Sequence, residues 1–179
     1  MVETWLEAHR DHIPPEVWEK RRRDWTPEVS ADGWARTLQE RDACPDQVRA
    51  CLLIAEDDSG LIVGLAAGAA SAADPAGWLG EIGSLYLHAE HRHRGLGRSL
   101  VQAVTAGLAD RGIRSLHIGV LTTNVEARQF YEALGGQLVV ERDFDDDGAR
   151  LSESVYAWTD ITSLVPPKQV HAKPSIGRE

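Results

Sequence analysis

The sequence contains little cysteine and no long apolar run. Its 179 residues include two cysteines, and Cys44 and Cys51 have neither CxxC spacing nor a histidine cluster beside them. Neither a disulfide framework nor a zinc knuckle is therefore expected. No apolar run approaches the roughly 20 residues that cross a bilayer, and the first residues lack the apolar core of a signal peptide. We expect a cytoplasmic protein with reduced thiols and no membrane partner.

An excess of positive charge is also missing. Lys and Arg number 19 against 28 Asp and Glu, which gives a formal net charge of -9. A chain of this charge repels nucleic acid, so no nucleic-acid partner is expected and any anion site must be local. Hydrophobic residues make up 42% of the chain, which predicts a single domain over residues 1–161. Residues 162–179, rich in Pro, Lys and Ser, are predicted to form a flexible tail.

Turn residues and hydrophobic periodicity divide the chain into helices and short strands. Prolines break the first 45 residues into two or three short helices. Further along, the pattern predicts strands at 49–57, 61–71, 78–88, 115–121, 137–144 and 150–159, and helices at 97–112 and 124–136. This order predicts an α+β fold with a mixed, mostly antiparallel central sheet of about six strands and helices on both faces. The crossover at 78–110 should be parallel and right-handed.

The stretch HAEHRHRGLGRSLV at 88–101 joins a predicted strand to a predicted helix. The free N–H groups at a helix start and the helix dipole make such a junction an anion site. Gly95 and Gly97 permit a close approach of the backbone to a phosphate. Arg92, Arg94 and Arg98 can add charge-assisted hydrogen bonds at the rim.

Three other uses of this stretch fit the sequence poorly. A Walker loop needs a lysine after its last glycine, and here Arg98 and Ser99 follow Gly97. A dinucleotide fingerprint needs a third glycine, and Leu100 takes that place. The three histidines of the stretch do not have the spacing of a known zinc motif, so no metal site is expected.

The glycine stretch and a second motif resemble the GNAT family of N-acetyltransferases. Arg92-His93-Arg94-Gly95-Leu96-Gly97 looks like that family's R/Q-x-x-G-x-G/A signature, which binds the pyrophosphate of acetyl-CoA. The segment NVEARQFYEALGG at 124–136 resembles its N-x-x-A-x-x-F/L-Y-x-x-x-G-F helix, and it follows in the expected order. The resemblance covers residues 49–159 and implies the family's acyl-CoA acyltransferase fold. There are two departures from the family pattern. The chain opens at the first helix, so either the family's first strand is absent or the true start lies upstream, and Gly136 replaces an aromatic residue.

The resemblance also implies which residues hold acetyl-CoA as co-substrate. The pyrophosphate would meet the backbone amides of the glycine stretch, with Arg92 and Ser99 near them, and the pantetheine arm would pair with the strand that precedes it. A β-bulge in that strand would open the slot for the arm, and the Leu87 N–H would polarise the thioester carbonyl. The implied cofactor residues are Leu85, Tyr86, Leu87, Arg92, His93, Arg94, Gly95, Leu96, Gly97, Arg98, Ser99, Asn124, Ala127 and Tyr131.

Acetyl transfer to an amine needs a base and an acid. Glu81 is the candidate base, because it lies at the offset from Arg92 at which the family's histone-type members carry their glutamate. The alternative is a strand carboxylate that faces solvent or pairs with an arginine. Tyr131 is the candidate acid for the leaving thiolate, and a core aromatic is its alternative. Asn124 can cap its helix, contact the pantetheine arm, or do both.

The acceptor is less well defined by the sequence. Asp143, Asp145, Asp146 and Asp147 would attract cationic amines, although DDDG is also typical of a solvated turn. Trp5, Trp18, Trp25 and Trp34 lie where the family forms its acceptor wall, and they can equally pack the core. We expect direct transfer in a ternary complex to a small-molecule or peptide amine, since no cysteine is placed for an acetyl-enzyme. A non-catalytic acyl-CoA-binding sensor or scaffold is the alternative; O-acetyl or longer-acyl transfer stays open, and a homodimer is a family-based expectation.

Overall fold

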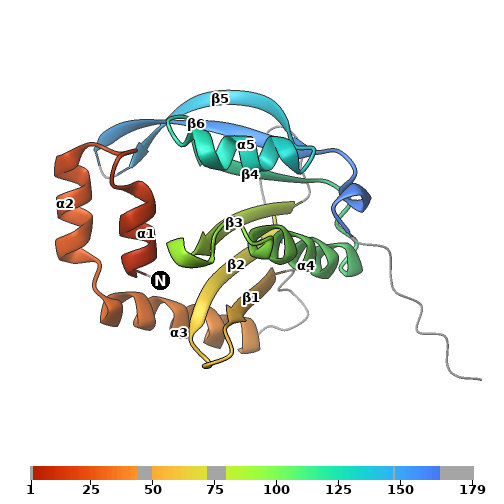
Figure 1. The fold of residues 1–179 in the computed structure, drawn as a ribbon, viewed down its shortest axis with the longest axis horizontal. Helices are drawn as coiled ribbons and strands as arrows, with labels where there is room; N and C mark the ends of the chain where they lie inside the picture. Colours follow the sequence, from red (N-terminus) through yellow and green to blue (C-terminus); the bar gives the residue numbers. More distant parts are fainter. Residues whose placement is uncertain (1, 44–49, 72–79, 147, 166–179) are drawn as a thin grey trace, which may run out of the picture.

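The computed structural model describes residues 2–43, 50–71, 80–146 and 148–165. Its sheet has six strands in the order β1-β2-β3-β4-β6-β5 (Figure 1), and every neighbouring pair is antiparallel except β3 and β4. The strands are β1 (Ala50–Glu56), β2 (Ile62–Ala70), β3 (Gly80–Leu87), β4 (Leu116–Leu121), β5 (Gln137–Asp146) and β6 (Ala149–Trp158). The helices are α1 (Val2–His9), α2 (Pro15–Asp24), α3 (Pro27–Ala43), α4 (Leu96–Asp110) and α5 (Val125–Ala133), with short 3-10 turns at Ala89–His91 and Ile161–Ser163. The predicted mixed sheet and its order of elements are confirmed.

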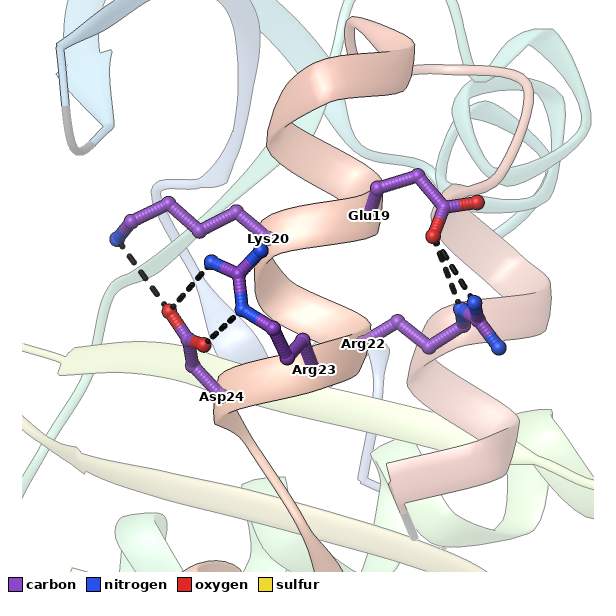
Figure 2. Close-up of polar contacts among 5 residues, drawn as sticks. All are labelled: Glu19, Lys20, Arg22, Arg23 and Asp24. Atoms are coloured by element: carbon purple, nitrogen blue, oxygen red, sulfur yellow. Dashed lines mark hydrogen bonds and ion pairs between the residues drawn. The ribbon is translucent and has the colours of Figure 1, made fainter.

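Charged side chains of α2 pair with one another on its exposed surface. α2, which the structure describes in full, has no buried residue. Figure 2 shows Glu19 paired with Arg22 (3.0 Å), and Asp24 paired with both Lys20 (3.9 Å) and Arg23 (2.8 Å). Exposed pairs of this kind contribute little stability. The helix is anchored instead by Trp18, whose indole Nε1 donates to the carbonyl of Leu6 on α1 (2.7 Å).

Helices cover both faces of the sheet, and β2 shows how. Gly64 and Gly68 lie on the face of α4, where a Cβ at Gly68 would stand 2.7 Å from Val104 Cγ1. Leu65, between them in the pleat, points to the opposite face together with its β3 partner Tyr86. There the Tyr86 ring lies 6.1 Å from the ring of His9 on α1. The small residues of β2 thus allow α4 to pack closely, while α1 covers the other side.

The buried core includes side chains of α4, α5, β4 and β6. Val104 and Leu108 of α4, Leu116 of β4 and Tyr156 of β6 have no exposed surface. Leu164 is 3% exposed and belongs to the same core. This side chain thus packs with the core although it follows the predicted boundary at 161. From 166 onward, the predicted tail of residues 162–179 lies outside the described residues.

The parallel strands β3 and β4 are paired over a short stretch and then part. Their register contains two pairs, Gly80 with Leu116 and Glu81 with His117. In β3, the pairing with β2 shifts so that Gly83 is an extra residue, a β-bulge. The β-bulge that the family resemblance implies for β3 is confirmed. From Ile82 onward, β3 is no longer paired with β4 in this register.

The two edges of the sheet differ in their surroundings. β5 is an edge strand with Leu138, Val139, Val140 and Phe144 exposed. At the other edge lies β1. A homodimer stays a prediction. None of the helices in the described part of the chain is long and apolar enough to cross a membrane.

Candidate active site

The connection between β3 and α4 has the backbone geometry of an anion cradle. Gly95 caps α4 in the left-handed conformation with φ at 83°, and His93 has φ at 58°. The first amides of α4 have no partner within the helix, and its first turn carries no acidic side chain. Gly97 is buried, and a Cβ there would lie 3.2 Å from Leu87 and 3.4 Å from Phe130. The loop thus has free amides and no acidic side chain at the start of α4, and a larger residue at Gly97 would crowd its packing; binding of a pyrophosphate there stays a prediction.

Side chains of the loop fasten it to neighbouring elements. Arg92 Nε donates to the Leu87 carbonyl (3.3 Å), and Arg98 donates to the Ala133 carbonyl (3.5 Å). His93 lies 3.2 Å from Glu126 of α5. Arg94 is exposed. Within the described residues, no group of three or more His, Cys, Asp or Glu side chains could hold a metal ion.

A cleft of about 460 Å³ lies where β3 and β4 part. Its walls come from the N-terminal helices, β3, β4, α5 and the β5–β6 hairpin. Of the predicted pantetheine residues, Leu85, Tyr86, Asn124, Ala127 and Tyr131 line it, and Leu87 does not. Asn124 caps α5, since its Oδ1 accepts from the Ala127 amide (3.0 Å), so the predicted cap is confirmed.

Tyr131 is held in the cleft as a neutral phenol. It is 6% exposed, and burial raises its pKa well above the usual value, with a smaller contribution from Tyr86. The pKa of Tyr86 is raised by burial too, and a hydrogen bond from the Trp5 indole partly offsets that rise. Both phenols therefore stay protonated at neutral pH and can donate hydrogen bonds.

Glu81 lies apart from the cleft walls. Its side chain is exposed on β3, where its backbone neighbours are Ala69 and His117. It is on the same side of the sheet as Tyr86 but is not among the residues that line the cleft. A base role for Glu81 stays a prediction.

Three acidic residues of the β5–β6 hairpin make contacts within the protein. Asp143 bonds Ser152 and pairs with Arg150, and the hydroxyl first and the guanidinium second lower its pKa. The Asp145 carboxylate accepts from the turn amide of Gly148 (3.0 Å). Asp146 pairs with Arg21 of α2 at 2.8 Å, and Asp147 lies outside the described residues. These contacts favour a structural role for these acidic residues over the binding of a cationic acceptor.

Two of the four N-terminal tryptophans line the cleft. Trp5 and Trp25 meet edge to face, with ring centroids 5.5 Å apart, and both belong to the wall. Trp18 packs under Arg10 and Arg22 instead, and Trp34 is half-buried in α3 outside the cleft lining.

Sequence reasoning missed several wall residues, namely His9, Ile13, Arg21, Phe144, Leu151 and Glu153. His9 stacks on Trp5 with ring centroids 4.1 Å apart. The spacing of Trp5 and His9 on one helix is the one sequence signal for this contact. That signal does not say which strand the pair meets.

A glycine-capped phosphate cradle beside a splayed parallel strand pair defines the class of acyl-CoA-binding acyltransferase folds. The profile of the acetyltransferase (GNAT) family matches residues 14–136, and the chain belongs to this family. It is similar to the uncharacterised N-acetyltransferase YuaI of Bacillus subtilis, with 29% identity over 113 residues. That match covers 63% of this chain and 65% of YuaI, so the chain spans just under two thirds of the relative's length.

Solved structures share the fold at low sequence identity. The PaiA N-acetyltransferase of Thermoplasma acidophilum, solved in complex with coenzyme A, is 21% identical with a TM-score of 0.59, and the match covers 86% of each chain. The yncA protein of Salmonella typhimurium, solved with its cofactor acetyl-CoA, is 18% identical with a TM-score of 0.57, covering 72% of this chain and 73% of that one. At these identities the likeness shows the fold, which is the predicted one.

Proposed function

We propose that the protein is an acetyl-CoA-dependent N-acetyltransferase that acetylates a primary amine of a small molecule or peptide in a ternary complex. The observations that carry this proposal are the cleft between β3 and β4, which is lined by the buried phenol of Tyr131, and the left-handed Gly95 that caps α4 after β3. Family membership supports the same class of reaction.

The cleft and the start of α4 each have a task in this reaction. Bound acetyl-CoA supplies the acetyl group as a thioester. The amides at the start of α4 bind the pyrophosphate, and the edge of β3 that faces the gap offers backbone groups to the pantetheine amides. Tyr131 gives its proton to the departing sulfur.

Direct transfer is supported by the position of Cys51. Its thiol lies in β1 next to Gly107 of α4, and it is not among the cleft-lining residues. Burial raises the pKa of this thiol, which lowers the share of reactive thiolate at neutral pH. Cys44 lies outside the described residues.

The cleft lining favours an acceptor amine on an apolar or aromatic group. Ile13, Trp25 and Phe144 are among the residues that line it. The two carboxylates there are paired, Asp146 with Arg21 (2.8 Å) and Glu153 with Arg142 (2.6 Å). Apolar contact with the carrier group therefore supplies more of the recognition than charge does.

A thiol-release assay tests the function directly. The protein is incubated with acetyl-CoA and a panel of spermidine, an aminosugar, tryptamine, phenethylamine, single amino acids and a basic peptide. We expect CoA release that depends on the amine and is highest for the aromatic alkylamines. Calorimetry with acetyl-CoA runs in parallel. Tight binding without release for any amine would favour the acyl-CoA-binding sensor, and no binding at millimolar concentration would overturn both functions.

A further inference from the structure

His9 ends α1 at the wall of the cleft. Its ring lies flat on Trp5, with ring centroids 4.1 Å apart and an interplanar angle of 12°. It is tilted against Tyr86 of β3 at 6.1 Å. These two contacts fix the imidazole, because rotation about its side-chain bonds would break the stacking.

One hydrogen bond defines which nitrogen of His9 carries the proton. Nδ1 lies 2.8 Å from the carbonyl oxygen of Trp5. A carbonyl only accepts, so Nδ1 is the N–H donor of the neutral ring and Nε2 carries the lone pair. Nε2 of His9 is therefore the nitrogen that can accept a proton, and His9 is one of the residues that line the cleft.

The surroundings keep this imidazole neutral. Burial lowers the pKa of His9, more than the bond to the Trp5 carbonyl raises it. The charges of His12, which follows α1, and of Arg21 of α2 lower the pKa of His9 further, while the charge of Asp146 of β5 raises it. Tyr86, which faces the ring from β3, is a neutral phenol. A ring that is neutral at pH 7 is ready to accept a proton.

The other titratable side chains of the described cleft wall are less suited to that task. Asp146 and Glu153 are paired with arginines at 2.8 and 2.6 Å. Tyr131 keeps its own proton, since its pKa is raised. Glu81 is exposed outside the cleft lining.

His9 and Tyr131 also approach the gap between β3 and β4 from opposite faces. Tyr131 packs in the core on the face of α4 and α5, where the cradle lies. His9 contacts Tyr86 on the other face. A base on one side and an acid on the other match a reaction in which amine and thioester meet in the gap.

We propose that His9 is the general base that takes a proton from the acceptor ammonium, a role that rests on the proposed N-acetyltransferase function. His9 Nε2 accepts one proton of the ammonium and later releases it to solvent. The neutral nitrogen forms a bond to the thioester carbonyl carbon, and the carbon–sulfur bond breaks. The thiolate takes the Tyr131 proton, and the second proton lost by the nitrogen restores the phenol. One amide, one thiol and one free proton result.

The pH dependence of kcat/KM tests this assignment with matched variants. We expect the wild-type rate to fall at acid pH through a pKa below the ordinary histidine value. His9→Gln should lose about 100-fold or more at pH 7 and lose that acid limb. Its rate should then rise with pH toward the pKa of the amine, and free imidazole should partly restore His9→Ala. His12→Gln, a nearby half-buried histidine outside the cleft lining, should keep the acid limb, because it removes a neighbour of His9 and not the base itself.

A second readout does not need turnover. In a long-range proton–nitrogen correlation spectrum at pH 7, wild-type His9 should show a protonated Nδ1 and an unprotonated Nε2. Protonation at Nε2 would overturn the proposal, and so would an acid limb that survives in His9→Gln or disappears in Glu81→Gln alone. If wild type releases no CoA with any amine, the proposed function fails and the base role fails with it, whatever the tautomer. If wild type turns over but His9→Gln matches it, the base role alone is lost.

Discussion

Glu81 on β3 and His117 on β4 form the last residue pair of the parallel ladder, and beyond them the two strands part. From Ile82 onward, β3 keeps its pairing with β2, shifted by the bulge at Gly83, while β4 stays paired with β6. In the described register, the backbone N–H and C=O groups of β3 and β4 beyond this pair do not pair with one another. Unpaired polar backbone in a protein interior needs a partner, and an extended ligand with its own amides would satisfy it.

The conformation of Gly95 predicts a binding defect without a steric clash. Its φ is +83°, and no atom lies within 4 Å of where a Cβ would stand. Gly95→Ala should therefore cost about 1 kcal/mol of unfolding free energy through backbone strain alone. We expect the free loop to relax this strain by leaving the Gly95 conformation, and its restoration on binding costs the same about 1 kcal/mol, so acetyl-CoA affinity measured by calorimetry should fall about fivefold.

Gly60 supplies the matched control for that variant. It has φ +82°, equally open space around the position of a Cβ, and a place in the turn between β1 and β2. Gly60→Ala should show the same loss of stability in urea denaturation with unchanged acetyl-CoA affinity. Equal affinities for both variants would mean that the Gly95 conformation does not serve binding.

The sequence was sufficient for features that depend on nearby residues. The positive φ at Gly95 and the cap by Asn124 follow from residues within one helical turn. The order of strands follows from apolar runs and turns. Contacts between distant segments did not follow: His9 and Tyr86 are 77 positions apart in the chain, and their meeting depends on how α1 packs on the sheet. The same limit hid the pairing of Asp146 with Arg21, which favours the structural alternative for this carboxylate.

Tyr131→Phe should slow transfer while leaving binding intact. Removal of the phenol hydroxyl takes away the proton donor for the thiolate and little volume. We expect kcat to fall about 100-fold, at the lower end for a general acid, with an unchanged Kd for acetyl-CoA. Tyr156→Phe is the control, because its hydroxyl bonds Glu132 (2.7 Å) and Arg128 (3.2 Å) away from the cleft lining. It should cost about 1 kcal/mol of stability and no activity, and a loss of activity as large as that of Tyr131→Phe would contradict the acid role.

Gly136, which replaces an aromatic residue of the family pattern, is explained by Trp158. A Cβ at Gly136 would lie 2.7 Å from Trp158 Cζ2 and 2.9 Å from the Tyr131 carbonyl oxygen. The indole of Trp158, whose Nε1 donates to the Leu134 carbonyl, already fills this space. Gly136→Ala should therefore destabilise by about 1–3 kcal/mol.

A double-mutant cycle separates this clash from a helix-end effect. In the Trp158→Leu background, Gly136→Ala should cost about 1 kcal/mol less than in wild type, a coupling typical of residues in contact. Gly33→Ala, in α3 with nothing within 4 Å of its Cβ position, should instead stabilise by about 0.5 kcal/mol. Additive costs in the cycle would show that Trp158 is not the obstacle.

Burial of Tyr131 predicts a stability loss in alkali that does not involve catalysis. In the unfolded chain this phenol releases its proton near pH 10, whereas in the folded protein its pKa is raised, chiefly by burial. Above about pH 10 the unfolded state therefore binds fewer protons, and the free energy of unfolding falls as pH rises. One such group contributes a slope of up to about 1.4 kcal/mol per pH unit. Urea denaturation between pH 9 and 11 should show a shallower decline for Tyr131→Phe than for wild type, while Tyr86 and Tyr156, whose pKa values are also raised, keep part of the slope in both proteins. Parallel curves would mean that the phenol of Tyr131 reaches solvent when the protein is folded.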